Sequence, residues 1–514
     1  MSIFKTRIFK FGIGLLFLVL GVYIFANKYA QSKVENLLSE KLPPQFELEY
    51  KSLSIDILSG SANLNEVLFQ IKNVNLDSIK SVFHIESIQL SGLGINALIQ
   101  GEDIELHRLE ISKPIGYYTP TVIAKDSTTS KAKQPNPLKG IRIENLEIKE
   151  ASITLREKKT DSSKLIIGNA ELTISELSLD LQTGPKPRIY FEDYEVDMGS
   201  LFVQASEFDE LEIDLISGNK QQTTLEGIAF RTIPSPQELS KMIPKERDHY
   251  ELLIDELSLQ ELELFEPESD YSLSAGFIDI AGLDLAIYRD KLLADDFSYK
   301  PTVNEMIRNI PWPFRVDSMS ITPKKINYQE RVVAANQGGK LFFADGHIGI
   351  QNLSNQLPET EDTEISIQSR FMGKADIEAL WTFNSNNPED SFRFSGNCKN
   401  VQLEDLNAFC QPNLNTLMAG ELKTLFFDFS GDSNQSLAKV KVRFKDVEIA
   451  VLKKKDGRRN KFFSSMANFI VRNNSDNKNG VYKEEQVTVT RDKTKSQFNF
   501  LYLNLKESMM RAFL

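Results

Sequence analysis

The sequence predicts a mainly β protein. An N-terminal transmembrane helix is followed by an elongated, twisted antiparallel β-sheet, curved into a groove, with a few short helices. Three observations lead to this prediction. The chain starts with an uncharged apolar run at residues 11–26. A fixed spacing of large apolar residues returns many times between residues 83 and 321. Long stretches with the 3.6-residue apolar period of a covering helix are missing from the sequence.

The apolar spacing is clearest between Leu252 and Leu264, where apolar residues stand at positions 252, 254, 257, 259, 262 and 264. These are pairs separated by three-residue steps, and the same frame fits residues 83–95 and 141–153. At about 100° per residue a helix would scatter these positions, whereas residues i and i+2 of a strand share a face. Each three-residue step then requires a β-bulge or a tight turn.

Two arrangements satisfy strands with one apolar and one polar face. The first is the ordinary one-sided strand of a β-sandwich. The second is an array that grows by adding strands, and the number of copies favours it. Because a one-sided sheet must bury its apolar face, the array predicts a curved sheet that closes around that face. Acyl chains would fill the space that side chains leave.

The N-terminal segment, residues 1–27, is predicted to be a membrane anchor. Residues 8–26 supply the roughly 20 largely apolar residues that a bilayer core requires, with Lys10 reaching back to the interface. Lys5, Arg7 and Lys10 precede the span, so we expect a cytoplasmic N-terminus with the rest of the chain across the membrane. The alternative is a cleaved signal peptide, which the poor cleavage site at residues 27–30 disfavours.

The rest of the chain divides into four predicted segments. Residues 28–123 begin with a short helix ended by two prolines and continue as a first β-groove segment. Residues 124–139 are polar, hold two prolines and are predicted to be a linker or disordered loop. Residues 140–400 hold the central groove strands. Residues 401–514 form a C-terminal segment with a basic hairpin and amphipathic helices.

Three further short helices are expected in these segments. Residues 238–244 align without gaps to residues 305–311, and each stretch ends in proline before a strand frame begins. Residues 401–409 are expected to form the third helix.

Composition and motifs exclude several function classes. The net charge of -12 argues against nucleic acid as a partner. The 4 histidines are far apart and match no metal-binding spacing, and no nucleophile elbow or phosphate-binding glycine loop occurs. We therefore expect no enzyme activity, no cofactor and no metal site. The 2 cysteines, Cys398 and Cys410, can either pair in an oxidising compartment or remain two free thiols.

Three tracts carry a resemblance to a known family. They are residues 46–60, residues 141–155, and Leu403-Glu-Asp-Leu-Asn followed by Gly420-Glu-Leu. Together with the N-terminal anchor and the recurring strand frames, they resemble the AsmA-like proteins. The resemblance covers most of the chain and implies a relation to TamB and to bridge-like lipid transfer proteins. It also implies a long bent sheet in the Gram-negative envelope whose apolar floor takes lipid acyl chains.

The predicted function is therefore that of an inner-membrane-anchored, mainly periplasmic protein. Its groove would hold phospholipid, or another acyl-chain lipid, or transfer it between membranes, affecting outer-membrane biogenesis. The alternative is a non-enzymatic scaffold of the envelope that binds other proteins. We expect Arg142, Glu144, Asp255 and Ser258 to face water. The predicted groove floor is Ile141, Ile143, Leu146, Ile148, Leu252, Ile254, Leu257 and Leu259.

A basic cluster near the C-terminus predicts contact with an anionic membrane surface, the alternative being a solvated hairpin tip. Residues 441–514 hold 17 Lys and Arg against 8 Asp and Glu. Replacing the cluster by Gln should weaken binding of the protein to anionic vesicles, each charge contributing about 1 kcal/mol or less. Vesicle binding that is unchanged and independent of salt would contradict this. The cluster consists of Lys453, Lys454, Lys455, Arg458 and Arg459.

Overall fold

The computed structural model describes most of the chain in two compact units. Unit 1 comprises residues 1–204 and 214–220, and unit 2 comprises residues 205–213 and 221–514. The predicted linker, the basic cluster and nearly all of the predicted anchor lie outside the described residues. No helix among the described residues has the length and apolar character of a membrane span. The described residues are 23–24, 27–32, 34–35, 46–73, 78–92, 104–119, 140–157, 162–180, 188–264, 272–452, 474–475 and 481–513.

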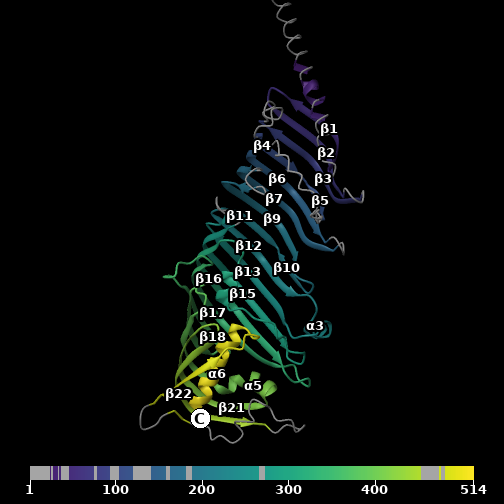
Figure 1. Ribbon diagram of the computed structural model, residues 1–514. Helices are drawn as coiled ribbons and strands as arrows, with labels where there is room; N and C mark the ends of the chain where they lie inside the picture. The colour runs from purple at the N-terminus through teal and green to yellow at the C-terminus, as the bar shows by residue number, and fades with distance from the viewer. Residues whose placement is uncertain are drawn as a thin grey trace, which may run out of the picture. The chain divides into compact units, whose positions relative to one another are not determined.

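Unit 1 is built from successive β-strands, which Figure 1 shows side by side. Strands β1, β2 and β3 pair antiparallel in chain order, and β3 pairs with both β4 and β5. Strands β6, β7 and β9 continue antiparallel. The strands are β1 (Phe46–Asp56), β2 (Ser61–Asn73), β3 (Ser78–Ser91), β4 (Ile104–Ser112), β5 (Ile115–Tyr118), β6 (Gly140–Arg156), β7 (Ser163–Asp180), β8 (Arg188–Tyr190), β9 (Asp193–Gln204) and β11 (Leu215–Asn219).

Unit 2 is also mainly β, as the sequence predicts. Its strands from β16 to β23 pair antiparallel in chain order. The strands are β10 (Asp209–Ile213), β12 (Gln222–Thr232), β13 (Asp248–Gln260), β14 (Glu263–Leu264), β15 (Leu273–Asp290), β16 (Phe314–Arg331), β17 (Gly339–Ser354), β18 (Thr363–Phe371), β19 (Ala375–Phe383), β20 (Phe392–Gln402), β21 (Thr416–Gly431), β22 (Gln435–Val451) and β23 (Lys483–Thr490). The helices are α3 (Pro236–Met242), α4 (Val303–Arg308), η1 (Leu403–Leu406), α5 (Asn407–Leu414) and α6 (Gln497–Phe513).

Several of the three-residue steps contain a residue in the left-handed backbone region, as the bulge prediction requires, although the β13 step at residues 255–256 does not. In unit 1 the steps of β2 and β7 hold Glu66 and Glu176, with φ of 50° and 53°. In unit 2 the steps of β12 and β15 hold Gly227 and Gly282, with φ of 64° and 72°. A left-handed residue interrupts the alternation of a strand, so the apolar pairs before and after it stay on one face.

The three-residue steps of neighbouring strands lie opposite one another. The strands therefore pair in the same register before and after the step. Leu225 pairs with Leu257 before the step, and Ile228 pairs with Ile254 after it. Asp255 of the β13 step lies opposite Gly282, whose Cα has no room for a side chain: an added Cβ would stand 2.1 Å from the Asp255 carboxylate. The steps thus form rows across the sheet.

The expectation of antiparallel pairing throughout is wrong at two places. β6 pairs parallel to β4 and β5 in unit 1, and β16 pairs parallel to β15 in unit 2. Parallel neighbours need a crossover of a dozen or more residues. Residues 291–313 supply it in unit 2 and contain α4.

Helices α3 and α4 overlap the two aligned stretches, residues 238–244 and 305–311, that predict them. Ser235 caps α3 and Thr302 caps α4, each accepting a hydrogen bond from the backbone N–H of a glutamate three residues on. Their connections differ, because α3 joins antiparallel strands and α4 joins parallel ones.

The C-terminal helices differ from expectation. The helix predicted at residues 401–409 begins only at Leu403, as the 3-10 turn η1, because β20 continues to Gln402; α5 then extends it to Leu414. Helix α6 has 17 residues, so the expectation of short helices only is wrong. Its apolar residues fall on one side, with Phe500, Met509 and Phe513 all buried.

Replacing Gly282 by Ala tests the left-handed steps. The new Cβ would force an L side chain into φ of 72° and press on Asp255, so we expect a loss of about 1–3 kcal/mol in unfolding free energy. Thermal unfolding of the purified protein measures it. The matched control is Gly349→Ala in β17, where the added Cβ meets only the Ser366 hydroxyl, at 2.8 Å. Equal stability of the two variants would contradict a role for the left-handed backbone.

Candidate functional site

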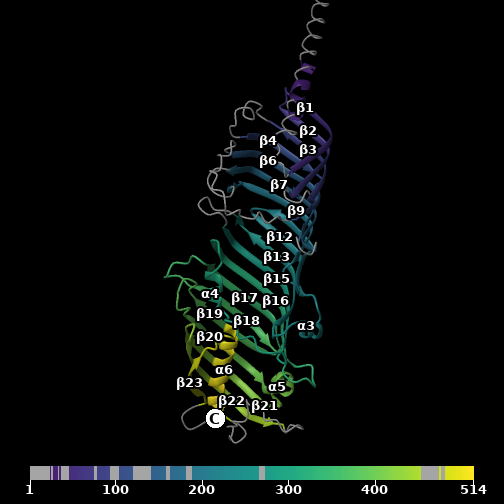
Figure 2. The same cartoon turned by 45° about the vertical axis from the view of Figure 1, so that its right-hand side comes forward.

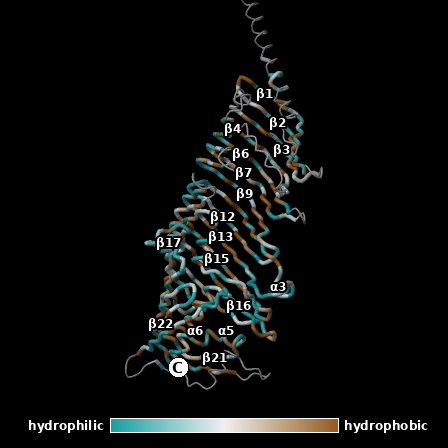
Figure 3. The backbone as a smooth tube through the Cα atoms, viewed as in Figure 1, coloured by the Kyte–Doolittle hydropathy of each residue, from teal (hydrophilic) through white to brown (hydrophobic). Residues whose placement is uncertain are grey.

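The apolar side chains of unit 1 form aligned rows on one face. Leu106, Ile143 and Leu177 occupy one level of three neighbouring strands and are buried against one another. The next level holds Leu109, Leu146 and Ile174, which pack on the same cluster and stay half-buried. Apolar and polar stretches alternate along the strands in Figure 3. The repeated frame therefore produces a continuous apolar surface within the unit.

Strand β6 carries the four predicted floor residues of this unit. Ile143 is 4% exposed, whereas Ile141, Leu146 and Ile148 are half-buried. Arg142 and Glu144 point to the opposite face and are exposed, as predicted. Arg142 forms an ion pair with Glu105 on β4.

Strand β13 carries the four predicted floor residues of unit 2. Ile254 is buried, Leu252 is half-buried, and Leu257 and Leu259 pack against a cluster of Ala275, Ile278 and Val316. The two sets of four lie in different units, so a trough continuous through both stays a prediction.

One of the two solvent-facing predictions on β13 is wrong. Asp255 is exposed as expected, but Ser258 is only 5% exposed. Its hydroxyl accepts a hydrogen bond of 3.3 Å from the Gln222 amide of β12. A long side chain on the neighbouring strand thus covers Ser258 on the polar face.

The apolar face is filled at the C-terminal end of unit 2. Helix α6 lies against β22 and β23 (Figure 2). Phe500 and Phe513 of the helix pack into one cluster with Val442, Phe444 and Phe429, all of them nearly inaccessible to solvent. This part is an ordinary hydrophobic core that the chain covers with its own helix.

Polar contacts hold the start of α6 and the segment before it to the crossover that links β15 and β16 and to the loop after α3. The Gln497 side chain accepts a hydrogen bond from the backbone N–H of Val303 at 2.7 Å, and Arg491 donates one to the Lys300 carbonyl at 2.6 Å. Lys495 forms an ion pair with Glu246 at 3.1 Å. None of these residues is among the functional residues predicted from the sequence. The apolar spacing at residues 500, 501, 508, 509, 512 and 513 is the signal that could have predicted the covering helix.

In unit 1, unlike the C-terminal end of unit 2, the described helical residues contact the apolar face only at its first strands. Residues 27–32 and 34–35 are helical, and Val34 packs on the cluster of Leu53, Leu64 and Val67. The Tyr23 hydroxyl donates to Asp56 at 2.9 Å, and Asn27 accepts from the backbone N–H of Ile57 at 2.9 Å. Among the described residues of unit 1, no other helix contacts the strands. The end of the predicted anchor and the helical residues after it therefore dock beside the first hairpin of the sheet.

Both cysteines are free and buried, which decides between the two alternatives left by the sequence. Burial raises the pKa of the Cys398 thiol and that of the Cys410 thiol to about 11 each. They therefore stay protonated and weakly nucleophilic at neutral pH. Within the part of the chain that the structure describes, no group of three His, Cys, Asp or Glu side chains could hold a metal ion.

Comparison of the chain with protein-family models, with curated proteins and with solved structures found no match. The features that bear on function are thus those of the molecule itself. They are an aligned apolar face, a helix docked at one end of it in unit 1, and a filled core at the C-terminal end of unit 2.

The two thiols should resist alkylation in the folded protein. At pH 8, a pKa of about 11 leaves roughly a hundredfold less thiolate than an unperturbed cysteine has. We expect iodoacetamide to label the native protein at least a hundredfold more slowly than the urea-unfolded protein, as followed by intact mass. A single-cysteine variant, Cys410→Ser, assigns the rate to Cys398. Rapid labelling of the native protein, or a mass 2 Da lower that indicates a disulfide, would contradict the buried free thiols.

Proposed function

We propose that this protein is a membrane-anchored, non-enzymatic lipid carrier of the AsmA-like kind. Its apolar β-face holds phospholipid acyl chains and passes them between the membranes of a Gram-negative envelope. One observation carries the proposal: aligned rows of half-buried apolar side chains share one face of unit 1, and the described helical residues touch only its first strands.

A hydrocarbon chain is a suitable occupant of such a face. Side chains such as Ile141, Leu146 and Ile148 pack sideways on their neighbours but keep part of their surface accessible. An acyl chain laid across them removes that surface from water, with a gain of roughly 0.8 kcal/mol for each buried CH₂ group. No hydrogen-bonding group is required for this binding, which agrees with a sequence that lacks polar ligand motifs.

The N-terminal region supports delivery from a membrane. Tyr23, near the end of the predicted anchor at residues 8–26, and Asn27, directly after it, bind the first hairpin. Val34 places this segment on the apolar face itself. A lipid leaving the bilayer beside the anchor would therefore meet the apolar face first. The proposed location is the inner membrane, with a cytoplasmic N-terminus and a periplasmic sheet.

A scaffold that binds other proteins is the second candidate function. The observation that favours it is the filled core under α6, where Phe429, Val442 and Phe444 leave no accessible apolar surface. If the apolar face of unit 1 were covered in the same way, lipid would have no place to bind.

Native mass spectrometry of the full-length protein, purified in mild detergent, separates the two functions. Lipid carriage predicts that phospholipid remains bound, and that Ile148→Asp and Leu257→Asp reduce the bound lipid at least fivefold. Both positions are half-buried, so the carboxylate can stay hydrated and the fold should survive. Ile143→Asp is less suitable, because Ile143 is 4% exposed and an unpaired charge there should unfold the sheet.

Arg142→Asp is the matched control, since it places the same charge on the polar face of β6. Thermal stability measured on all variants shows whether they fold. Wild-type protein without lipid, together with unfolding of both half-buried variants, would contradict lipid carriage and favour the scaffold.

A further inference from the structure

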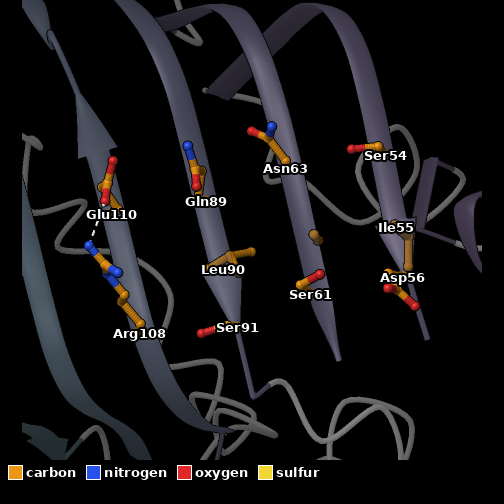
Figure 4. A pocket seen from close by; sticks show the side chains of 11 residues that line it. Ser54, Ile55, Asp56, Ser61, Asn63, Gln89, Leu90, Ser91, Arg108 and Glu110 are labelled. Carbon is orange, nitrogen blue, oxygen red and sulfur yellow. Dashed lines mark hydrogen bonds and ion pairs between the residues drawn. The ribbon is translucent and has the colours of Figure 1, made fainter. Parts of the chain in front are cut away.

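A polar hollow of about 320 Å³ lies on unit 1, across strands β1 to β4. Figure 4 shows the side chains that line it, two polar levels with Ile55 and Leu90 between them. The first level is Ser54, Asn63, Gln89 and Glu110, which the strand register places side by side. The second level is Asp56, Ser61, Ser91 and Arg108, which the same register aligns.

The hollow lies on the opposite face from the proposed lipid surface. Asn63 stands between Ala62 and Leu64, and Gln89 stands between Ile88 and Leu90. Successive side chains of a strand point to opposite faces. The lining also includes Ile55, Ala62 and Leu90, which alternate with these polar residues along the strands. The polar side chains of the hollow therefore form a site on the face opposite the acyl chains.

The charges in the hollow disfavour an anionic ligand. Arg108 already contacts Glu110 at 2.8 Å and Glu147 at 2.7 Å, so its charge is balanced. A hydrogen bond from Lys149 lowers the pKa of Glu110, and one from Tyr23 lowers the pKa of Asp56. Both carboxylates thus remain ionised at neutral pH, and Asp56 has no ion-pair partner among the described residues. A phosphate group would meet repulsion here.

The side chains with spare hydrogen-bonding capacity are neutral. The Asn63 Oδ1 atom is buried and has no hydrogen-bonding partner, which is costly unless a ligand or water supplies one. In the described part of the chain the side chains of Gln89, Ser54 and Ser91 also make no hydrogen bond. Amides and hydroxyls both donate and accept, so this set matches the paired hydroxyl groups of a polyol.

We propose that this hollow binds an uncharged sugar unit, either free or as the head of a glycolipid. The amides of Asn63 and Gln89 span neighbouring hydroxyls, the serine hydroxyls extend the network, and the Asp56 carboxylate accepts from a further hydroxyl. The volume of about 320 Å³ is at the lower end of the range for small-molecule sites and accommodates one sugar ring.

Saturation-transfer NMR on the full-length protein in phosphocholine nanodiscs tests the proposal. Glycoside detergents are avoided because they would compete. The probes are the methyl glycosides of glucose, galactose, mannose and N-acetylglucosamine, with glycerol 3-phosphate and phosphoethanolamine as charged contrasts. At least one glycoside should bind and the charged probes should not. Gln89→Ala and Asn63→Ala should weaken that binding at least tenfold.

The control variant is Asn65→Ala, on the same face of β2 but one level outside the hollow, where the Asn65 amide bonds Ser52. It should leave glycoside binding unchanged. Because Gln89 is exposed, its variant should fold normally, and circular dichroism checks this for all three. Ile148→Asp should also keep glycoside binding, so failure of lipid carriage and failure of this site are distinguishable.

Two further outcomes complete the test. If a glycolipid incorporated in the nanodisc binds more tightly than its methyl glycoside, the natural ligand is a lipid headgroup. If the two bind equally, the natural ligand is a free sugar. Absence of binding by all four glycosides would overturn the proposal. So would glycoside binding that Gln89→Ala leaves unchanged, or a preference for phosphoethanolamine, which would instead assign a charged headgroup.

Discussion

The structure depends on one backbone constraint: a three-residue step between two pairs of apolar residues, at the same level on adjacent strands, with a left-handed residue in the steps of strands such as β7, β12 and β15. Without it, simple alternation would turn the second pair of each strand to the polar face. Gly227 and Gly282 adopt this conformation at little cost, and Asp255 fills the space that the missing Cβ of Gly282 leaves. Glu176 adopts it as well, so the constraint is met even where the residue type disfavours it. The apolar pairs on either side of such a step thereby share one face.

That one-sidedness creates the surface and also the need to cover it. At the C-terminal end of unit 2 the chain covers it with its own helix α6, and Phe444 and Val442 become inaccessible. In unit 1 Val34 contacts only the cluster of the first strands, and residues such as Leu146 stay half-buried. Accessible apolar surface on one face of a sheet is a place where a partner can bind. A hydrocarbon chain is the partner that we propose for it.

The sequence predicted which side chains share a face, because the spacing of apolar residues directly reports strand alternation. It also predicted α3 and α4, whose caps and terminal prolines are local signals. It did not predict strand direction, because parallel and antiparallel neighbours present the same apolar rows. The burial of Ser258 depends on Gln222 of another strand, and the contacts of α6 involve residues near position 300. Such features arise from tertiary packing, which no local pattern records.

The central claim is that lipid occupies the apolar face and not the polar one. Photocrosslinking from single sites on β6 tests it most directly. A benzophenone amino acid would replace Leu146 or Ile148 on the apolar face, or Arg142 or Glu144 on the polar face, in cells that make the full-length protein. Mass spectrometry would then identify the adducts. The account predicts phospholipid adducts at Leu146 and Ile148 and none at Arg142 and Glu144. Equal lipid labelling of both faces, or adducts with protein alone, would contradict it.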